Sequence, residues 1–288
     1  MIRVCRLLLS VLIVLSGLPA LHAEIIYVDN ILGDDAYDGT SATPINPTSG
    51  PVRTFGRGLQ LLKPGLRLNI TNTGLPYFGS LELNGAKHSG TPLSPMFIDG
   101  NGAEINGAIP VPKTGWQQVG QSLWKFTPFR KGHYLLILDN KALPETVVPR
   151  DSLELPDLAE HHWAAWQGAI YFKASTLEVP ADLELWFATR SMGITLYDVH
   201  DIIVRDIKVR HFRIDGINAH DRCKNTVLER ITAEENGRAG VVAAGSSKIL
   251  LVKPTVNNNL RHSVLVLENA SVQIDDETNV APKPTVPE

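Results

Sequence analysis

Hydrophobic residues recur along the second half of the chain at a spacing of 23 to 24 residues. One column of this repeat holds Ile194, Ile217, Val241 and Val264. Other columns hold Asp201, Asn225, Lys248 and Ser271; Val204, Leu228, Leu251 and Ile274; and Val209, Ala233 and Val256. So short a period suits stacked β-strands, because helical repeats need longer units with 3.6-residue spacing. The pattern predicts a β-solenoid over residues 193–274.

Within each repeat, apolar residues alternate with polar ones, as in Ile202 and Val204. Alternate side chains of a strand point to opposite faces, so one face of every strand is expected to line a common core. Corners between the strands are predicted at residues that tolerate left-handed backbone conformations. They are Asp215-Gly216, Asn236-Gly237, Gly240, Gly245 and Asn257-Asn258-Asn259. The repeat resembles that of the right-handed parallel β-helix proteins of the pectate-lyase-like superfamily.

The first part of the chain resembles the entry of exported proteins of this kind. Residues 25–28 are predicted as a strand, and an Asp/Gly-rich loop follows. An amphipathic helix is expected over about 52–62, ending at Lys63-Pro64-Gly65, with a strand from 66 to 71. The resemblance implies that this helix caps the open end of the coil, which would otherwise expose core and strand edges.

The solenoid is expected to begin near residue 66, and the repeat is lost from about 110 to 190. We interpret these residues as a β-rich insertion packed on the coil. The predicted fold is therefore an all-β, right-handed parallel β-helix over residues 24–274, with a short N-terminal capping helix and this insertion. Residues 275–288 contain acids and prolines without a repeat, and are expected to form a disordered tail.

Residues 1–23 have the features of a secretory signal peptide. Arg3 and Arg6 precede an apolar run from Leu7 to Leu18, and cleavage is expected after Ala20 or Ala23. A retained membrane anchor is the alternative, but the run is short for a span and no later segment is a candidate. We expect a protein that is secreted, periplasmic or at the cell surface.

Composition excludes some functions of the mature chain. Loss of Arg3 and Arg6 takes the formal net charge of the 288-residue chain from -3 to -5, and loss of Cys5 leaves Cys223 alone. An intrachain disulfide is then excluded. Nucleic-acid binding is not expected either, because no basic patch is concentrated enough to neutralise several phosphates.

Two features suggest ligands. The carboxylates of Asp34, Asp35 and Asp38 could bind calcium, although Asp-Gly sequences also simply form turns. Trp163 and Trp166 adjoin two histidines and could stack on sugar rings, as could the outward-pointing Tyr197; the tryptophans could instead fill the core of the insertion.

Candidate catalytic residues lie near one corner of the predicted coil. Asp215 and His262 share one row of the repeat, Arg238 and Arg261 share the next, and His220 is an outward strand position. The stacked arginines could bind a carboxylate or sulfate, or could pair with nearby glutamates. Each histidine could act as a general base.

The resemblance implies an enzyme that acts on an extracellular, acidic polysaccharide by lyase-like cleavage, with Arg, Lys or His as the base. Arg213-Ile214-Asp215-Gly216-Ile217 resembles the Asp-Gly-Ile phrase of polygalacturonase-type hydrolases. The second pair of carboxylates in that family is replaced by Gly237-Arg238-Ala239-Gly240, which argues against its two-acid mechanism. The alternative function is a non-catalytic carbohydrate-binding or cell-surface adhesion module.

Overall fold

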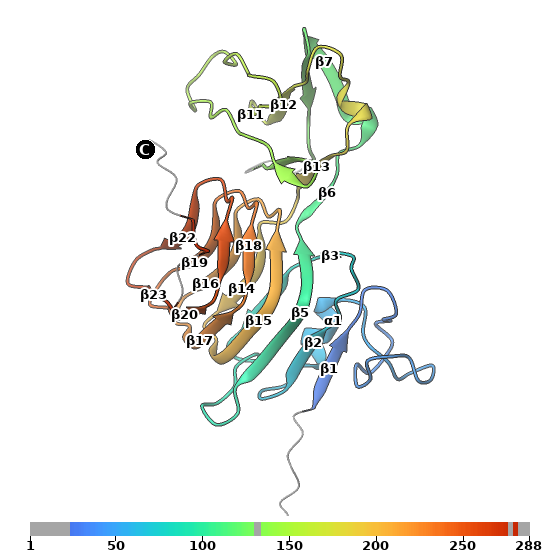
Figure 1. Ribbon diagram of the computed structural model, residues 1–288, viewed down its shortest axis with the longest axis vertical. Helices are drawn as coiled ribbons and strands as arrows, with labels where there is room; N and C mark the ends of the chain where they lie inside the picture. Colours follow the sequence, from blue (N-terminus) through green and yellow to red (C-terminus); the bar gives the residue numbers. More distant parts are fainter. Residues whose placement is uncertain (1–23, 130–133, 276–278, 282–288) are drawn as a thin grey trace, which may run out of the picture.

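The structure, a computed structural model, describes residues 24–129, 134–275 and 279–281. The predicted signal peptide lies outside these ranges. The strands wind into a coil, and a β-rich lobe branches from one side of it (Figure 1). Within the described residues, no helix is long and apolar enough to cross a bilayer.

The coil has three faces of parallel strands, which we call faces A, B and C. Long strands β5 (Met96–Asn106) and β15 (His200–Arg210) bend from face A into face B. Face A also contains β1 (Ile25–Val28), β2 (Arg67–Ile70), β17 (Lys224–Glu229), β20 (Lys248–Val252) and β23 (Ser271–Ile274). Face B adds β3 (Tyr77–Phe78), β18 (Thr232–Glu234) and β21 (Thr255–Asn257). Face C contains β4 (Leu81–Asn84), β14 (Met192–Tyr197), β16 (Asp215–His220), β19 (Ala239–Ala243) and β22 (His262–Val266).

The strand register confirms the predicted repeat. Ile194 pairs with Ile217, Ile217 with Val241, and Val241 with Val264, so the first column lies across face C. The first three of these side chains are fully buried in the core of the coil. The coil also starts earlier than predicted, because β1 already pairs in parallel with β2.

Several corners differ from the prediction. Left-handed backbone occurs as predicted at Gly245 and Asn258, with φ of 69° and 51°. Elsewhere it falls at His211 and Glu235, with φ of 61° and 57°, whereas Asn236-Gly237 does not adopt it. Asn236 instead contributes its side chain: Oδ1 accepts from the Phe212 N–H at 3.1 Å, and Nδ2 donates to Oδ1 of Asn259 at 2.9 Å. Because Asn236 is fully buried, these bonds satisfy groups that water cannot reach.

The predicted capping helix is present as α1 (Phe55–Leu61), which is shorter than expected. Val52 forms a parallel bridge with Val28, so the chain is still extended there. Thr54 then caps the helix by accepting a hydrogen bond from the Arg57 N–H at 3.2 Å. A Cβ on Gly58 would lie 2.9 Å from Cγ2 of Val28, so the helix can approach the first strand only with glycine there.

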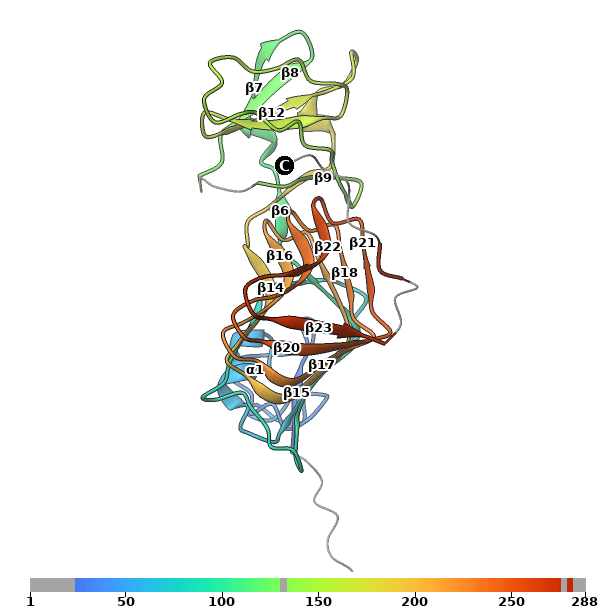
Figure 2. The same cartoon turned by 90° about the vertical axis from the view of Figure 1, so that its left-hand side faces the viewer.

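The insertion contains two small antiparallel sheets (Figure 2). One has the order β10-β9-β13-β6, with β6 (Ala108–Pro110), β9 (Leu136–Leu138), β10 (Lys141–Ala142) and β13 (Leu185–Ala188). The other has the order β11-β12-β8-β7, with β7 (Trp116–Gly120), β8 (Leu123–Phe126), β11 (Trp163–Trp166) and β12 (Ala169–Lys173). Two 3-10 turns, η1 (Lys113–Gly115) and η2 (Pro180–Asp182), complete it.

Beyond β23, the described part of the expected tail contacts the coil. Val280 bridges Val256 in parallel, which adds a further extended segment to face B. The other described residues of this stretch are 275, 279 and 281.

Candidate functional site

The predicted catalytic corner contains an ion pair whose carboxylate is buried and whose arginine is partly exposed. Arg238 donates from Nε to Oδ1 of Asp215 at 2.9 Å and from Nη2 to Oδ2 at 2.6 Å. Asn218 donates to the same Oδ2 at 2.8 Å, and Asp215 is fully buried. The hydrogen bonds to Asp215 raise the pKa of Arg238. The carboxylate is therefore covered by its own arginine, and substrate cannot reach it in this arrangement.

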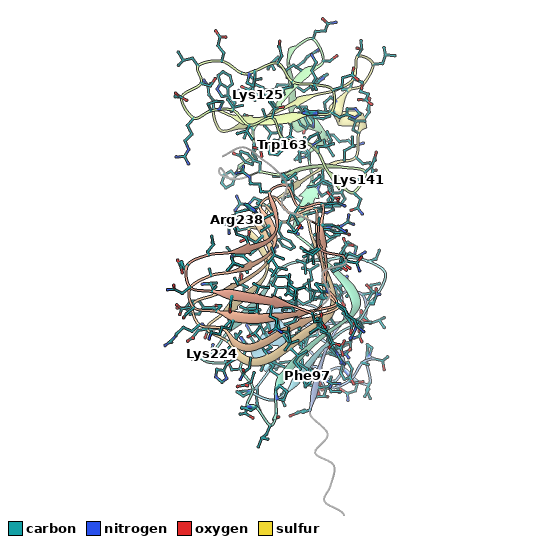
Figure 3. All side chains as sticks on the ribbon, turned by 60° about the vertical axis from the view of Figure 1, so that its left-hand side comes forward. Phe97, Lys125, Lys141, Trp163, Lys224 and Arg238 are labelled. Carbon is teal, nitrogen blue, oxygen red and sulfur yellow. The ribbon has the colours of Figure 1, made fainter. Side chains whose placement is uncertain are left out.

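Arg261 lies one rung further and faces the insertion. Its Nη2 is 3.9 Å from Oε2 of Glu145, a residue of the insertion, and the backbone N–H groups of Arg261 and His262 both donate to the Arg238 carbonyl. Burial raises the pKa of Glu145, and the charge of Arg261 opposes that shift. Figure 3 shows Arg238 at the side of the coil that faces the insertion. The structure thus brings together Asp215, Arg238, Arg261 and His262.

His220 is not part of this group. It lies at the opposite end of β16 from Asp215, about 16 Å away at 3.3 Å per residue. There it packs edge-on against Tyr197, with 4.9 Å between ring centroids. The two rings form a small exposed aromatic patch, away from the predicted corner.

The two predicted stacking tryptophans have different environments. Trp163 is fully buried in the insertion, and its Nε1 donates to the Leu143 carbonyl at 2.9 Å (Figure 3). A buried ring cannot offer a face to a sugar, so Trp163 is a core residue. Trp166 is half-buried, donates to the Ser152 carbonyl at 3.3 Å and packs against Tyr171.

The three acidic residues proposed as calcium ligands serve local structure. Asp34 and Asp38 each accept a hydrogen bond from the backbone N–H two residues ahead, at 2.9 and 3.0 Å. Asp35 accepts from the N–H groups of Arg53 and Thr54, both at 2.9 Å, and thereby fixes the start of α1. Within the described residues, no three His, Cys, Asp or Glu side chains come close enough to hold a metal ion.

Two hollows in the surface lie where the first rungs meet the insertion. One hollow, of about 430 Å³, contains three carboxylates, from Glu104 on β5, Asp139 beside β9 and Glu184 beside β13. We call it the acidic hollow. Its remaining lining is Pro76, Phe78, Asn106, Ile137, Asn140, Trp186 and His211.

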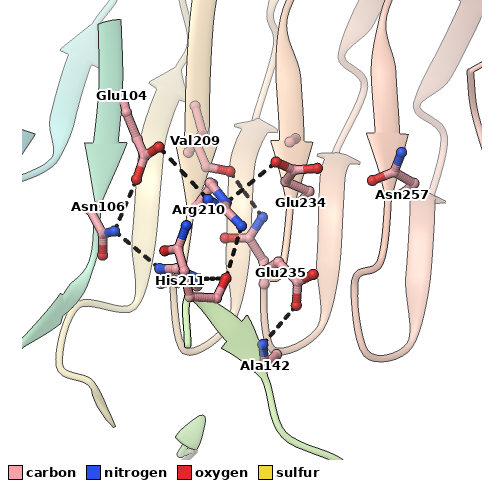
Figure 4. Close-up of polar contacts among 12 residues, drawn as sticks. Glu104, Asn106, Ala142, Val209, Arg210, His211, Glu234, Glu235 and Asn257 are labelled. Atoms are coloured by element: carbon pink, nitrogen blue, oxygen red, sulfur yellow. Dashed lines mark hydrogen bonds and ion pairs between the residues drawn. The ribbon is translucent and has the colours of Figure 1, made fainter. Parts of the chain in front are cut away.

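Hydrogen bonds and ion pairs connect the polar side chains of face B that border the acidic hollow (Figure 4). Arg210 lies between two glutamates, with Nη1 3.8 Å from Glu104 and Nε 3.4 Å from Glu234. Asn106 donates to Oε1 of Glu104 at 3.1 Å. These contacts fix the Glu104 carboxylate in one orientation at the hollow.

His211 is buried beside this network. The Asn106 amide lies 3.0 Å from its Nδ1, and the Asn140 carbonyl lies 3.3 Å from its Nε2. An amide donates and a carbonyl accepts, so the ring is neutral with its proton on Nε2. Burial, helped by the charge of Arg210, lowers the pKa of His211 to about 4.

The same network attaches the insertion to the coil. Asp139 and Asn140 form the tight turn between β9 and β10, with φ of 50° and 63°. Arg210 donates to the Asn140 carbonyl at 3.0 Å, and Glu235 accepts from the Ala142 N–H at 2.8 Å. Burial raises the pKa of Glu235. Part of this polar cluster is therefore a joint between two subdomains.

A second hollow, of about 400 Å³, lies on the other side of Phe78 and contains Arg190 and Arg213; we call it the cationic hollow. Phe78 and Asn106 line both hollows. Phe78 on the coil stacks on Trp186 of the insertion, with 5.9 Å between centroids and 12° between the planes. Partly exposed stacked rings of this kind can carry the apolar face of a sugar.

Sequence reasoning missed the residues of face B. Glu104, Arg210 and Glu234 occupy outward positions on adjacent rungs, since Lys208 pairs with Glu104 and Arg210 with Glu234. The alternation around Val209 and Ala233 already contained this signal. Glu104 and Asn106 were harder to find, because the insertion separates them from the regular repeat.

These features define a right-handed parallel β-helix protein, and the comparisons agree. Residues 181–279 match the family described as the right handed beta helix region. A comparison with curated protein sequences gave no match.

Solved structures share the fold at low identity. A XylC complex with xylose has 11% identity and a TM-score of 0.57 over 87% of this chain and 57% of that one. A glycoside hydrolase has 10% identity and a TM-score of 0.50 over 86% and 80%. Pectate lyase Pel9A has 13% identity and a TM-score of 0.42 over 88% and 56%. The chain thus spans a little over half the length of the XylC structure. The predicted right-handed parallel β-helix fold is confirmed.

Proposed function

We propose that the protein is an enzyme that cleaves a polysaccharide bound across the junction of coil and insertion. The observation that carries this proposal is the acidic hollow, in which three carboxylates lie beside the stacked pair Phe78 and Trp186. Two solved structures with this fold, a xylose complex and a glycoside hydrolase, support a carbohydrate ligand.

The structure favours hydrolysis in the acidic hollow over β-elimination at the corner of Asp215 and Arg238. Glycoside hydrolysis commonly uses two carboxyl groups, one as acid and one as base or nucleophile. Glu104, fixed by Asn106 and Arg210, is one candidate, and the exposed Glu184 is the other. A lyase reaction with Arg238 as base would leave Asp215 buried without its partner.

The test is to incubate the mature protein with neutral and acidic polysaccharides while following both reducing ends and absorbance near 235 nm. Reducing ends without absorbance indicate hydrolysis, and absorbance indicates elimination. We expect hydrolysis, with at least a hundredfold lower kcat in Glu104→Gln and Glu184→Gln. Glu154→Gln is the matched control, because Glu154 is exposed on the insertion and lines neither hollow. Unchanged kcat in both hollow variants would contradict the proposal.

A non-catalytic binding module is the second candidate. It is favoured by the pairing of the two predicted catalytic arginines with Asp215 and Glu145. Retardation in gels that contain a polysaccharide, without product formation, would support this candidate over the enzyme. Trp186→Ala should then lose the retardation.

We also propose export of the protein, on the basis of Arg3, Arg6 and the apolar run that ends at Leu18. The intact mass of protein recovered from outside the cytoplasm should begin after Ala20 or Ala23. Recovery of only the full-length chain in the cytoplasm would contradict it.

A further inference from the structure

The two hollows on either side of Phe78 carry opposite charge. Three carboxylates line the acidic hollow, and none of its described lining residues is Lys or Arg. Arg190 and Arg213 line the cationic hollow, and none of its described lining residues is Asp or Glu. A ligand that crosses Phe78 therefore meets carboxylates on one side and guanidinium groups on the other.

Arg190 stands where several hollows meet. It directly follows the Thr189 end of the insertion, is exposed, and lines the cationic hollow and two adjoining depressions. Its backbone N–H donates to the Gly107 carbonyl at 3.2 Å, which fixes its position. Within the described ranges, no carboxylate oxygen lies within 4.0 Å of its guanidinium.

In this respect Arg190 differs from several arginines of the coil that are paired with carboxylates. Arg205, for example, is 2.6 Å from Asp99, and Arg230 is 2.7 Å from Asp206. Each of these ion pairs bridges neighbouring rungs, so Arg205 and Arg230 have structural roles in the coil. A guanidinium left with its donors directed at a hollow is suited to bind a carboxylate or sulfate bidentately.

The walls of the cationic hollow also suit a sugar. Phe78, Ile109 and Phe187 supply apolar surface, and Thr189 supplies a hydroxyl. The acidic hollow, in contrast, would repel a second anionic unit on the far side of Phe78. Although Arg210 lies beside Glu104, the carboxylates of Asp139 and Glu184 also line this hollow. A uniformly anionic polymer fits this pair of hollows less well than a mixed one.

We infer that the substrate is a mixed glycan, in which an anionic sugar unit in the cationic hollow adjoins an uncharged unit in the acidic hollow, and that Arg190 binds the anionic group. This inference rests on the proposed function, since it names the substrate class of the same junction. It makes Arg190 a specificity-determining residue.

The test compares four polymers: a xylan with glucuronate side units, the same xylan after reduction of its carboxyl groups to alcohols, polygalacturonate, and a sulfated galactan. Retardation in polymer-containing gels and initial rates of reducing-end formation are measured for each. We expect the wild type to show a KM about tenfold lower for a mixed anionic polymer than for the reduced xylan, and little action on polygalacturonate. The expected difference should shrink at high salt.

Variants locate the anion site. Arg190→Gln should raise KM about tenfold for the preferred anionic polymer, and Arg190→Lys should raise it less. Arg150→Gln is the control, because Arg150 is exposed on the insertion and lines none of these hollows. Circular dichroism and the unfolding midpoint show whether each variant is folded.

The outcomes separate the inference from the proposed function. If KM is equal for the acidic and the reduced xylan, and the sulfated galactan is not preferred, the inferred anion site is wrong. Cleavage of these polymers would still support the proposed function. Preference for polygalacturonate overturns the mixed glycan, and a normal KM in Arg190→Gln overturns the role of Arg190. Preference for the sulfated galactan supports the anion site with sulfate as its ligand. Absence of both binding and cleavage on all four polymers contradicts the proposed function itself.

Discussion

Arg238 and Asp215 lie on adjacent rungs of the coil, and two hydrogen bonds of 2.9 and 2.6 Å join the guanidinium to the carboxylate. The Asp215 side chain is fully buried. The arginine was predicted to be catalytic, but this geometry gives it a structural role. Removal of one partner of a buried pair leaves the other charge in the interior, where its desolvation is not compensated.

Arg238→Gln should therefore lower the free energy of unfolding by about 3 kcal/mol. Arg261→Gln on the next rung is the matched comparison, because the Arg261 pair is longer, at 3.9 Å, and half exposed. That variant should change stability by less than about 1 kcal/mol. Denaturant unfolding followed by tryptophan fluorescence measures both. Equal effects of the two substitutions would show that the Asp215 pair contributes no more to the free energy of unfolding than the exposed pair does.

The buried amides of Asn236 and Asn259 give a second prediction. Asn236→Ala removes the acceptor of the buried Phe212 N–H and leaves Oδ1 of Asn259 with only the backbone N–H of residue 236 as donor. The free energy of unfolding should fall by about 2 kcal/mol. Asn269→Ala, at an exposed position, should change it by less than about 0.5 kcal/mol. A loss at Asn236 no larger than that control would mean that water replaces the amide.

The buried His211 predicts a dependence of stability on pH. Its pKa falls from 6.5 to about 4 on folding, chiefly through burial, so the unfolded chain binds the proton more readily than the native protein. The stabilisation is complete above pH 6.5 and is lost as the pH falls towards 4. The loss amounts to about 3 kcal/mol at most. Glu145 and Glu235, whose pKa values burial raises, act in the opposite sense.

The comparison of wild type with His211→Gln isolates this contribution. Glutamine can accept from Asn106 and donate to the Asn140 carbonyl, but it does not titrate. Unfolding by denaturant at pH 7 and pH 5 should show a smaller loss in the variant. The same loss in both proteins would assign the acid sensitivity to other groups.

Asp35 is predicted to stabilise the start of α1 without calcium. It accepts hydrogen bonds from the N–H groups of Arg53 and Thr54 and from the Thr54 hydroxyl at 2.8 Å. Asp35→Ala should lower the free energy of unfolding by about 1 to 2 kcal/mol, and Asp34→Ala by less. Thermal melts with calcium and with a chelator should coincide. A calcium-dependent rise in midpoint that Asp35→Ala abolishes would restore the metal site.

The fold was largely predictable because one physical signal repeats. Ile194, Ile217 and Val241 share a column in the sequence for the same reason that they pair in space: each rung buries the same position. Corner conformations were less predictable. His211 and Glu235 adopt left-handed backbone although neither is Gly or Asn, since hydrogen bonds of the coil determine the path of the chain.

The candidate site was only partly predictable, because it depends on contacts between distant segments. The alignment of the repeat correctly predicted that Asp215 lies near Arg238. Nothing in the local sequence shows that Arg238 binds both carboxylate oxygens and so blocks access to them. Trp186 and Phe78 are 108 positions apart in the chain and meet only through the packing of the insertion. The placement of Trp163 in a core was an open alternative that burial decided.

The carbonyl of Gly107 accepts hydrogen bonds from the N–H groups of both Thr189 and Arg190, at 2.9 and 3.2 Å. The chain thus leaves the coil and returns to it at a single peptide group. The two ends of the insertion are therefore adjacent in space. Because the entropic cost of closing a loop rises only slowly with its length, a longer or shorter insertion would disturb the coil little. Such a position can accept exchange of one lobe for another while the rungs keep their pairing, and recognition could then diversify on an unchanged scaffold.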